Sequence, residues 1–376
     1  MKGVEVVTHK DLMLHLDNSY ERLLPLFVWG TFGIGKSYMI REFGKKVAKE
    51  RGLKYTENPF ERGKDFFTVA IVSAHQLDAG GVQGLPFPDE DRKRTTFLLT
   101  KFLPEEKDSQ GILFWDELNL APQLIQNNCY SLIWDRGLPM LNYYLPKQWI
   151  SIGAGNTVED RAHIQEMPMP LKNRMGHVQL LPPTVAEWDA NFASPAGIDQ
   201  RITLFLYFRE DYLLKFDTDI AEEQIAVPSP RTWEMASRAI KGIDNLEHVQ
   251  KFVGRYVGAS IGAEMKAWLN LSKKVNIDKV YKDGKVSVPS EPSEAFALMS
   301  AIIEYFAKKS KIAEEAPKVA ETLLDLTYSF KKEHGVIILR QAMSACPKYF
   351  DLMKSSPTAK KKLVDAKTNY AHLITG

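Results

Sequence analysis

Two short stretches in the first half of this chain combine side chains suited to binding phosphate and a metal ion. The first is a glycine-rich loop that ends in a lysine and a hydroxyl: Gly30, Thr31, Phe32, Gly33, Ile34, Gly35, Lys36 and Ser37. Glycines let successive backbone N–H groups point at phosphate oxygens, and the N-terminus of a following helix adds partial positive charge. In this pattern the lysine reaches the β- and γ-phosphates and the hydroxyl binds Mg²⁺. The loop therefore predicts a site for a nucleoside triphosphate with Mg²⁺.

The carboxylates that such a site needs lie in the second stretch, an apolar run that ends in Asp116 and Glu117. Adjacent acids at the end of a buried strand repel each other and lose hydration, so stability alone does not favour them. A Mg²⁺ ion held by Asp116 removes this difficulty, and Glu117 is then free to orient and activate an attacking water. An exposed acidic pair is the alternative, and the upstream phosphate loop favours the catalytic interpretation.

Three further polar residues are candidates for the same site. Asn156 follows the glycine-containing apolar stretch Ile150–Gly155, and its amide can hold a water near the γ-phosphate. A turn-forming asparagine is the alternative at this position. Arg174 and Arg231 carry guanidinium groups of the kind that stabilise a transferring phosphoryl group. For each arginine the alternative is a solvated surface residue.

These residues need a scaffold that brings the ends of separate strands together. Five short apolar runs have the length and composition of strands buried on both faces: Leu26–Trp29, Phe66–Val72, Ile112–Trp115, Trp149–Ala154 and His177–Leu181. Helical patterns lie between most of them, most clearly at Ser37–Arg51 and Pro122–Asp135. This alternation predicts an α/β fold over residues 1–185, with a parallel sheet and right-handed crossovers.

Two insertions interrupt that alternation. The stretch Gln76–Pro104 is rich in Gly and Pro and contains a candidate strand, Thr95–Leu99, so we expect a functional loop or hairpin there. A second hairpin is expected at Gly137–Tyr144, directly before the fourth strand.

Helical patterns take over after Pro183. Gln200–Phe216 is expected to be a helix, and Ser229 with Pro230 has the composition of a helix start, with the serine as N-cap. The Lys-rich stretch Leu271–Ser293 holds a turn and two prolines and is expected to be a linker. Residues 293–376 are expected to be helical again.

Composition excludes some classes of function. The 49 Lys and Arg residues nearly balance the 47 Asp and Glu residues, so the net charge of +2 predicts no nucleic-acid partner, although a local basic patch stays open. Cys129 and Cys346 are far apart, which predicts a reducing, cytoplasmic setting without a disulfide framework. The scattered histidines suggest no zinc site. The apolar stretches are too short and too interrupted for a membrane span.

The order of these features resembles the AAA+ ATPases and, within them, the MoxR-like branch. The resemblance covers about residues 1–270, and the run Asp-Glu-Leu-Asn-Leu-Ala-Pro is its most specific part. The stretches that carry it are Gly30–Ser37, Trp115–Pro122, Asn156, Leu171–Arg174 and Ser229–Arg231. It implies a P-loop αβα core of five parallel strands at residues 1–185 and a helical lid at residues 186–272. A linker and a helical extension of unassigned role then occupy residues 273–376.

The resemblance also implies a role for each site residue. Gly30–Ser37 corresponds to the Walker A loop, and Asp116 and Glu117 to the Walker B pair. Asn156 corresponds to the sensor 1 residue. Arg174 is similar to the arginine finger, which acts on the nucleotide of a neighbouring subunit, although Arg161 and Lys172 lie near the same expected junction. Arg231 is similar to the sensor 2 arginine, which couples the lid to the γ-phosphate.

The activity that the resemblance implies is that of an ATPase, which converts ATP and water to ADP and phosphate with Mg²⁺. It also implies a homo-oligomer, usually a hexameric ring, that remodels a protein client and works with a partner carrying a von Willebrand factor A domain. Both insertions are then expected to face the axis or upper surface of the ring. Two alternatives stay open: a nucleic-acid motor or loader, and a nucleotide-dependent switch or scaffold with slow hydrolysis. The low net charge argues against the first, and the intact Glu117 against the second.

Overall fold

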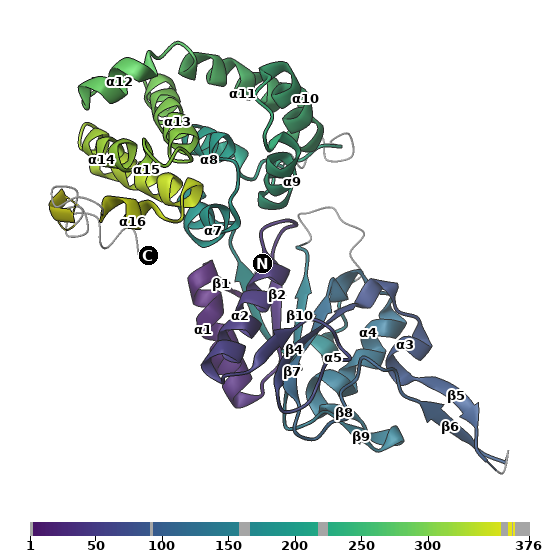
Figure 1. Cartoon of the computed structure of the whole chain (residues 1–376). Helices are drawn as coiled ribbons and strands as arrows, with labels where there is room; N and C mark the ends of the chain where they lie inside the picture. The colour runs from purple at the N-terminus through teal and green to yellow at the C-terminus, as the bar shows by residue number, and fades with distance from the viewer. Residues whose placement is uncertain are drawn as a thin grey trace. The chain divides into compact units, whose positions relative to one another are not determined.

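The computed structural model describes residues 3–90, 93–157, 166–216, 225–354, 360–362 and 364. The chain divides into two units, Met1–Pro182 and Pro183–Gly376. Strands and helices alternate in the first unit, and the second is built from helices (Figure 1). Arg161 lies outside the described residues.

A seven-stranded sheet, in the order β1-β11-β2-β10-β7-β4-β3, forms the centre of the first unit. Every neighbouring pair of strands is parallel, as predicted. The five predicted strands are the central ones, and the two at the edges were not predicted. The strands are β1 (Glu5–Val7), β2 (Leu26–Trp29), β3 (Lys54–Thr56), β4 (Phe66–Ser73), β7 (Gln110–Asp116), β10 (Gln148–Gly155) and β11 (Gly176–Leu180).

Helices cover both faces of this sheet (Figure 1). On one face, Tyr20 of α1 (His9–Arg22) makes edge contacts with Phe43 of α2 (Lys36–Glu50) and with Phe67 of β4. On the other face, α4 (Gln123–Tyr130) and α5 (Met169–Lys172) bury their apolar residues against alternate residues of β2, β4 and β7. Cover on both faces explains why the central strands read as continuous apolar runs.

Both predicted insertions form antiparallel hairpins. The first contains a 3₁₀ turn (Ala74–Gln76), α3 (Ala79–Gln83) and the strands β5 (Leu85–Pro88) and β6 (Thr95–Leu98). Its two strands project away from the sheet, and every residue in them is exposed (Figure 1). The second, shorter hairpin pairs β8 (Gly137–Leu138) with β9 (Tyr143–Tyr144).

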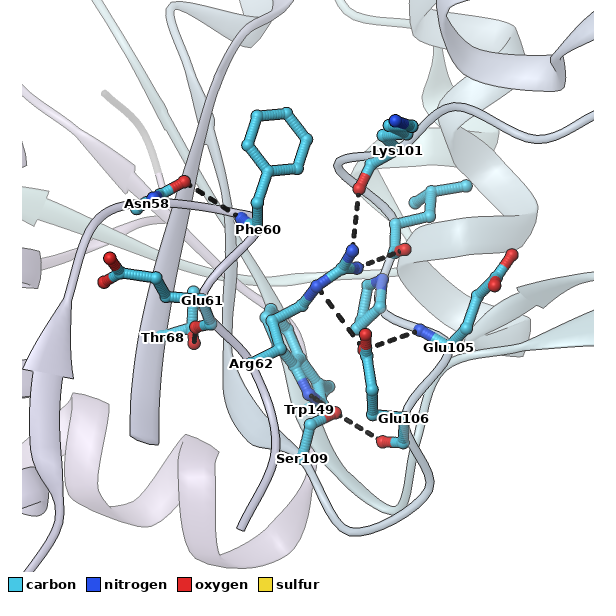
Figure 2. A network of polar contacts seen from close by, with 12 residues as sticks. Asn58, Phe60, Glu61, Arg62, Thr68, Lys101, Glu105, Glu106, Ser109 and Trp149 are labelled. Atoms are coloured by element: carbon cyan, nitrogen blue, oxygen red, sulfur yellow. Dashed lines mark hydrogen bonds and ion pairs between the residues drawn. The ribbon is translucent and has the colours of Figure 1, made fainter. Parts of the chain in front are cut away.

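A polar network anchors the returning segment of the first insertion to the sheet (Figure 2). The Arg62 guanidinium donates to the backbone carbonyls of Lys101 and Leu103 and pairs with Glu106, its Nε lying 3.4 Å from Oε2. Ser109 continues the network, because its hydroxyl donates to the Glu106 carbonyl and accepts a bond from the Trp149 indole. These contacts join the end of the insertion to the beginnings of β7 and β10, so the hairpin projects from a fixed base.

In the second unit, helices on both sides of residue 272 pack around one hydrophobic core. The helices are α6 (Val185–Trp188), α7 (Ser194–Ala196), α8 (Gln200–Phe208), α9 (Pro230–Ile240), α10 (Leu246–Val257), α11 (Ala259–Ser272), α12 (Ile277–Asp283), α13 (Pro292–Lys309), α14 (Ala316–Thr327), α15 (Lys332–Ala345) and α16 (Tyr349–Met353). The division of these helices into a lid and an extension stays a prediction. None of the described helices has the length and apolar character needed to cross a bilayer.

Three local features of the second unit bear on the sequence analysis. The predicted start of α9 is confirmed, since Ser229 and Thr232 form a capping box. The helix expected at Gln200–Phe216 ends earlier, at Phe208, because the backbone of Arg209 leaves the helical region (φ −127°, ψ 70°). The expected linker contains α12, which the Asn276 side chain caps by accepting a hydrogen bond from the Lys279 N–H.

A buried carboxylate ties α15 to the first helices of this unit. Asp189 accepts hydrogen bonds from Ser194, Tyr207 and Gln341 and lies 3.4 Å from an Arg340 nitrogen. Burial raises the pKa of Asp189, and the hydrogen bonds and the arginine oppose that rise. Removing a partner of such a carboxylate leaves a buried charge uncompensated, so this network fixes how the C-terminal helices pack.

Candidate functional site

The glycine-rich loop connects the carboxyl end of β2 to the first turn of α2. Gly33 and Gly35 have positive φ values of 71° and 102°, which residues with a side chain rarely adopt. Gly30 meets a different demand, because a Cβ there would lie 2.8 Å from the Ile34 side chain and 3.1 Å from the Leu180 carbonyl oxygen. Backbone conformation therefore requires glycine at positions 33 and 35, and close packing requires it at position 30.

Lys36 closes the loop on itself. Its ammonium nitrogen lies 2.6 Å from the Gly30 carbonyl oxygen and 2.9 Å from that of Thr31. It also donates to Oδ1 of Asn156, at 2.9 Å, across from the end of β10. The lysine is 8% exposed, so these contacts hold its charge at a defined place. The structure thus brings together the predicted phosphate-binding lysine and the predicted sensor asparagine.

Ser37 and Asp116 meet in the same way. The Ser37 hydroxyl donates to Oδ2 of Asp116 at 2.9 Å. These two oxygens are the ligand types that Mg²⁺ takes from a protein when phosphates and waters supply the rest of its octahedron. Among the residues that the structure describes, no cluster of three or more His, Cys, Asp or Glu side chains could hold a metal ion. A Mg²⁺ ion bound mainly through phosphate needs no such cluster, so the two residues fit it.

Glu117 points to a different partner from its neighbour Asp116. Its backbone is left-handed (φ 55°), which turns the chain as β7 ends. Its carboxylate pairs with His75, whose Nδ1 lies 3.1 Å from Oε2. The adjacent acids therefore have different partners, Ser37 for Asp116 and His75 for Glu117. The Glu117 side chain is 40% exposed, so water can reach it.

His75 was not predicted as a site residue. It lies in the 3₁₀ turn directly after β4, and β4 pairs with β7 so that Ser73 faces Asp116. A polar residue just after a strand was visible in the sequence. The sequence did not show that β4 lies beside β7, and this pairing decides that His75 meets Glu117.

Asn119 is the second residue that sequence reasoning missed. It is fully buried, and its amide bonds both backbone groups of Asn156. Its Nδ2 donates to the Asn156 carbonyl at 2.9 Å, and its Oδ1 accepts from the Asn156 N–H at 3.2 Å. Gly155 makes room for this clamp, because a Cβ there would lie 2.2 Å from Oδ1 of Asn119. Asn119 therefore sets the position of the residue that contacts Lys36.

We expect Asn119→Ala to lower the free energy of unfolding by about 2 kcal/mol or more, because two buried backbone groups lose their partner. Denaturant unfolding of the purified chain measures this. The matched control is Asn128→Ala, which removes an exposed hydrogen bond to Gln83 and is expected to change stability little. Equal stability of the Asn119→Ala variant and the wild type would contradict the clamp.

The two candidate arginines lie in different units. The Arg174 guanidinium donates to the Pro170 carbonyl at 2.9 Å and lies 5.4 Å from the centre of the Tyr130 ring. Arg231 is exposed in the first turn of α9. Lys172, the other described basic residue near the expected junction, pairs with Glu166 at 3.8 Å. The roles of these residues toward a nucleotide stay predictions.

Comparison with known proteins adds little to this geometry. No protein-family model and no curated protein matches the chain. Similar solved structures include Brucella abortus NtrX in complex with ADP, at 13% identity over 91% of this chain and 68% of that one, with a TM-score of 0.37. A Cytophaga hutchinsonii protein proposed to be an ATPase shares 12% identity over 95% of this chain and 80% of its own, with a TM-score of 0.32. These identities and TM-scores are too low to assign the chain a family or a function.

Proposed function

We propose that this chain is an ATPase that binds ATP with Mg²⁺ at the loop Gly30–Ser37 and hydrolyses it to ADP and phosphate. The observation that carries the proposal is the meeting of side chains from three neighbouring strand ends. Lys36 contacts Asn156 at 2.9 Å, and Ser37 contacts Asp116 at the same distance. A lysine, a hydroxyl, a carboxylate and an amide gathered beside a glycine loop are the set that phosphoryl transfer requires.

The described contacts suggest what each residue does with the substrate. Phosphate oxygens carry charge, so they would bind the Lys36 ammonium more strongly than the neutral Gly30 and Thr31 carbonyls that it contacts here. Ser37 and Asp116 would hold Mg²⁺, which neutralises charge on the phosphates. Glu117 would accept the proton of the attacking water, and Asn156 would orient that water.

We further propose that the protein belongs to the AAA+ ATPases, in the MoxR-like branch, and works as a homo-oligomeric ring, with six subunits the expected number. In this proposal Arg174 acts on the nucleotide of the neighbouring subunit, and Arg231 couples the helical lid to the γ-phosphate. The exposed position of Arg231 at the start of a capped helix is compatible with that role.

Exposed apolar side chains on the first hairpin support the proposal of a protein client. Leu85, Phe87 and Leu98 are 60%, 55% and 55% exposed, and Leu85 pairs directly with Leu98 across the hairpin. Contiguous exposed apolar side chains mark interaction surfaces, because water alone is an unfavourable neighbour for them. We propose that this hairpin contacts the client, and that a protein with a von Willebrand factor A domain assists.

Lys36→Met tests the nucleotide site directly. We expect ATP affinity, measured by calorimetry with Mg²⁺ present, to fall by about tenfold or more, because bonds to a charged donor are lost. The matched control is Lys45→Met on the same helix, where the lysine pairs with Glu42 in an exposed ion pair. Wild-type affinity in the Lys36→Met protein would overturn the proposal. Turnover that DNA or RNA stimulates, with steep salt dependence, would favour a nucleic-acid motor instead.

A further inference from the structure

A histidine outside the nucleotide site joins two segments of the first unit. The Trp29 indole N–H donates to Nδ1 of His177 at 3.0 Å. Nε2 of the same ring lies 2.8 Å from the backbone carbonyl oxygen of Lys172. An indole nitrogen can only donate, so Nδ1 must accept and carries no proton. Nε2 therefore carries the ring's proton and donates it to Lys172, which fixes one neutral tautomer.

Each end of this bridge lies beside a residue of the proposed reaction. Trp29 is the last residue of β2, and the next residue is Gly30. The Gly30 carbonyl accepts a bond from Lys36, and its N–H donates to Gly155 at 3.2 Å. Lys172 ends α5, two positions before Arg174. The His177 ring therefore connects the start of the phosphate loop to the turn that carries Arg174.

Packing makes the connection stiff. The Trp29 and His177 rings are stacked, with centroids 6.1 Å apart, and Phe27 lies against both. Leu171 and Met175, which flank the Arg174 turn, are buried in the same apolar cluster as Phe27 and Trp29. Side chains packed this closely move together, because the interior has few voids into which one of them could shift alone.

We infer that His177 is a positioning residue that couples the phosphate loop of one subunit to the arginine that the same subunit presents to its neighbour. The inference rests on the proposed function, in which Arg174 acts across a subunit interface. Phosphate would draw the Lys36 ammonium away from the Gly30 carbonyl. The resulting change at Gly30 passes to Trp29, through His177 to the Lys172 carbonyl, and so to Arg174. Nucleotide in one subunit thereby sets the catalytic competence of the next.

Three substitutions separate the two links of the bridge. His177→Asn keeps an amide near the position of Nδ1 but is too short to reach Lys172. His177→Gln keeps a donor near the position of Nε2 but loses the acceptor for Trp29. Trp29→Phe keeps an aromatic ring, although a smaller one, and removes the indole N–H. Each is expected to lower kcat about 10- to 100-fold with little change in the KM for ATP, because the variants misplace Arg174 and leave the nucleotide loop intact.

His248→Asn is the matched control, since His248 is an exposed residue of α10, and it is expected to leave kcat and KM unchanged. A purely structural role for His177 predicts a different result, in which the melting temperature falls and KM rises along with the loss of kcat. Wild-type kcat in Trp29→Phe and in both His177 variants would overturn the inference.

Mixed assemblies give the decisive test. His177→Asn subunits, whose turnover is lowered because their own arginine is misplaced, are mixed with Glu117→Gln subunits, whose His177 and Arg174 are intact. We expect turnover to rise well above the sum of the two parents, because a His177→Asn subunit beside a Glu117→Gln subunit then receives a correctly placed arginine. The same mixture made with Arg174→Ala subunits reports whether the arginine acts across the interface at all.

The outcomes separate the inference from the proposed function. Rescue of both Arg174→Ala and His177→Asn supports the inference. Rescue of Arg174→Ala alone overturns it while leaving the shared site standing, because His177 would then act within its own subunit. Rescue of neither overturns the shared site itself, and the inference with it.

Discussion

The Glu117→Gln variant is expected to bind ATP with Mg²⁺ as the wild type does and to hydrolyse it about 10²- to 10⁴-fold more slowly. Glutamine keeps the size and the hydrogen-bonding oxygen of the side chain but cannot accept the proton of the attacking water. Glu117 pairs with His75 at 3.1 Å, so the change leaves the contact between Ser37 and Asp116, the proposed metal ligands, in place. Phosphate release in the steady state and ATP affinity by calorimetry measure the two effects separately.

Glu21→Gln is the control for this experiment, since Glu21 is an exposed acid on α1 and no part of the site. Its turnover should equal that of the wild type. A Glu117→Gln protein that hydrolyses ATP at the wild-type rate would remove Glu117 from the mechanism and leave the His75 pair as an ordinary surface contact. If the variant binds ATP without turnover, affinity recovery of proteins bound to it offers a route to the client, because such an assembly should stay closed on what it holds.

Arg174→Ala is expected to reduce turnover about 10³- to 10⁵-fold while ATP binding survives. The reason is the proposed role of Arg174, whose guanidinium would stabilise the negative charge that develops on the nucleotide of the neighbouring subunit during hydrolysis. Among the described residues, the substitution removes a bond to the Pro170 carbonyl and the contact with the Tyr130 ring. Stability should therefore change little, and denaturant unfolding beside phosphate release distinguishes a lost catalytic group from a damaged fold.

Two further variants sharpen the arginine prediction. Arg174→Lys keeps the charge but not the planar fork, so its turnover is expected to fall between those of the wild type and Arg174→Ala. Lys172→Ala removes the charge that pairs with Glu166 and keeps the backbone carbonyl that His177 contacts. Near-normal turnover in Lys172→Ala together with loss in Arg174→Ala would assign the role to Arg174. Full turnover in Arg174→Ala would refute the shared site.

Features set by neighbours in the chain were predictable. The loop Gly30–Ser37 needs a strand before it and a helix after it, and both are contiguous with it in the sequence. The glycines indicated a sharply curled backbone, because glycine adopts a conformation such as that of Gly35 without strain. The start of α9 was equally local, because the serine cap and the residue that it bonds are three positions apart. The central strands were recognisable as runs too apolar to face water on either side.

Features set by strands that meet across the sheet were not predictable. β1 and β3 have three residues each and keep exposed positions, so neither gives an apolar run long enough to stand out. His75 and Asn119 were missed because each contacts a residue that follows another strand. His75, directly after β4, pairs with Glu117, which follows β7. Asn119 bonds Asn156, which follows β10. A linear pattern cannot say which strand ends lie side by side.

The residues of the candidate site could be named from residue order: a glycine-rich loop with Lys36 and Ser37, a pair of acids at one strand end, and an amide at another. Those assignments depend on residue type and short-range spacing, which the chain carries however it folds. The residues that hold these groups in place, His75, Asn119 and His177, became visible only in the folded unit. Each of their contacts joins segments that the order of strands brings together, and packing of the whole unit sets that order.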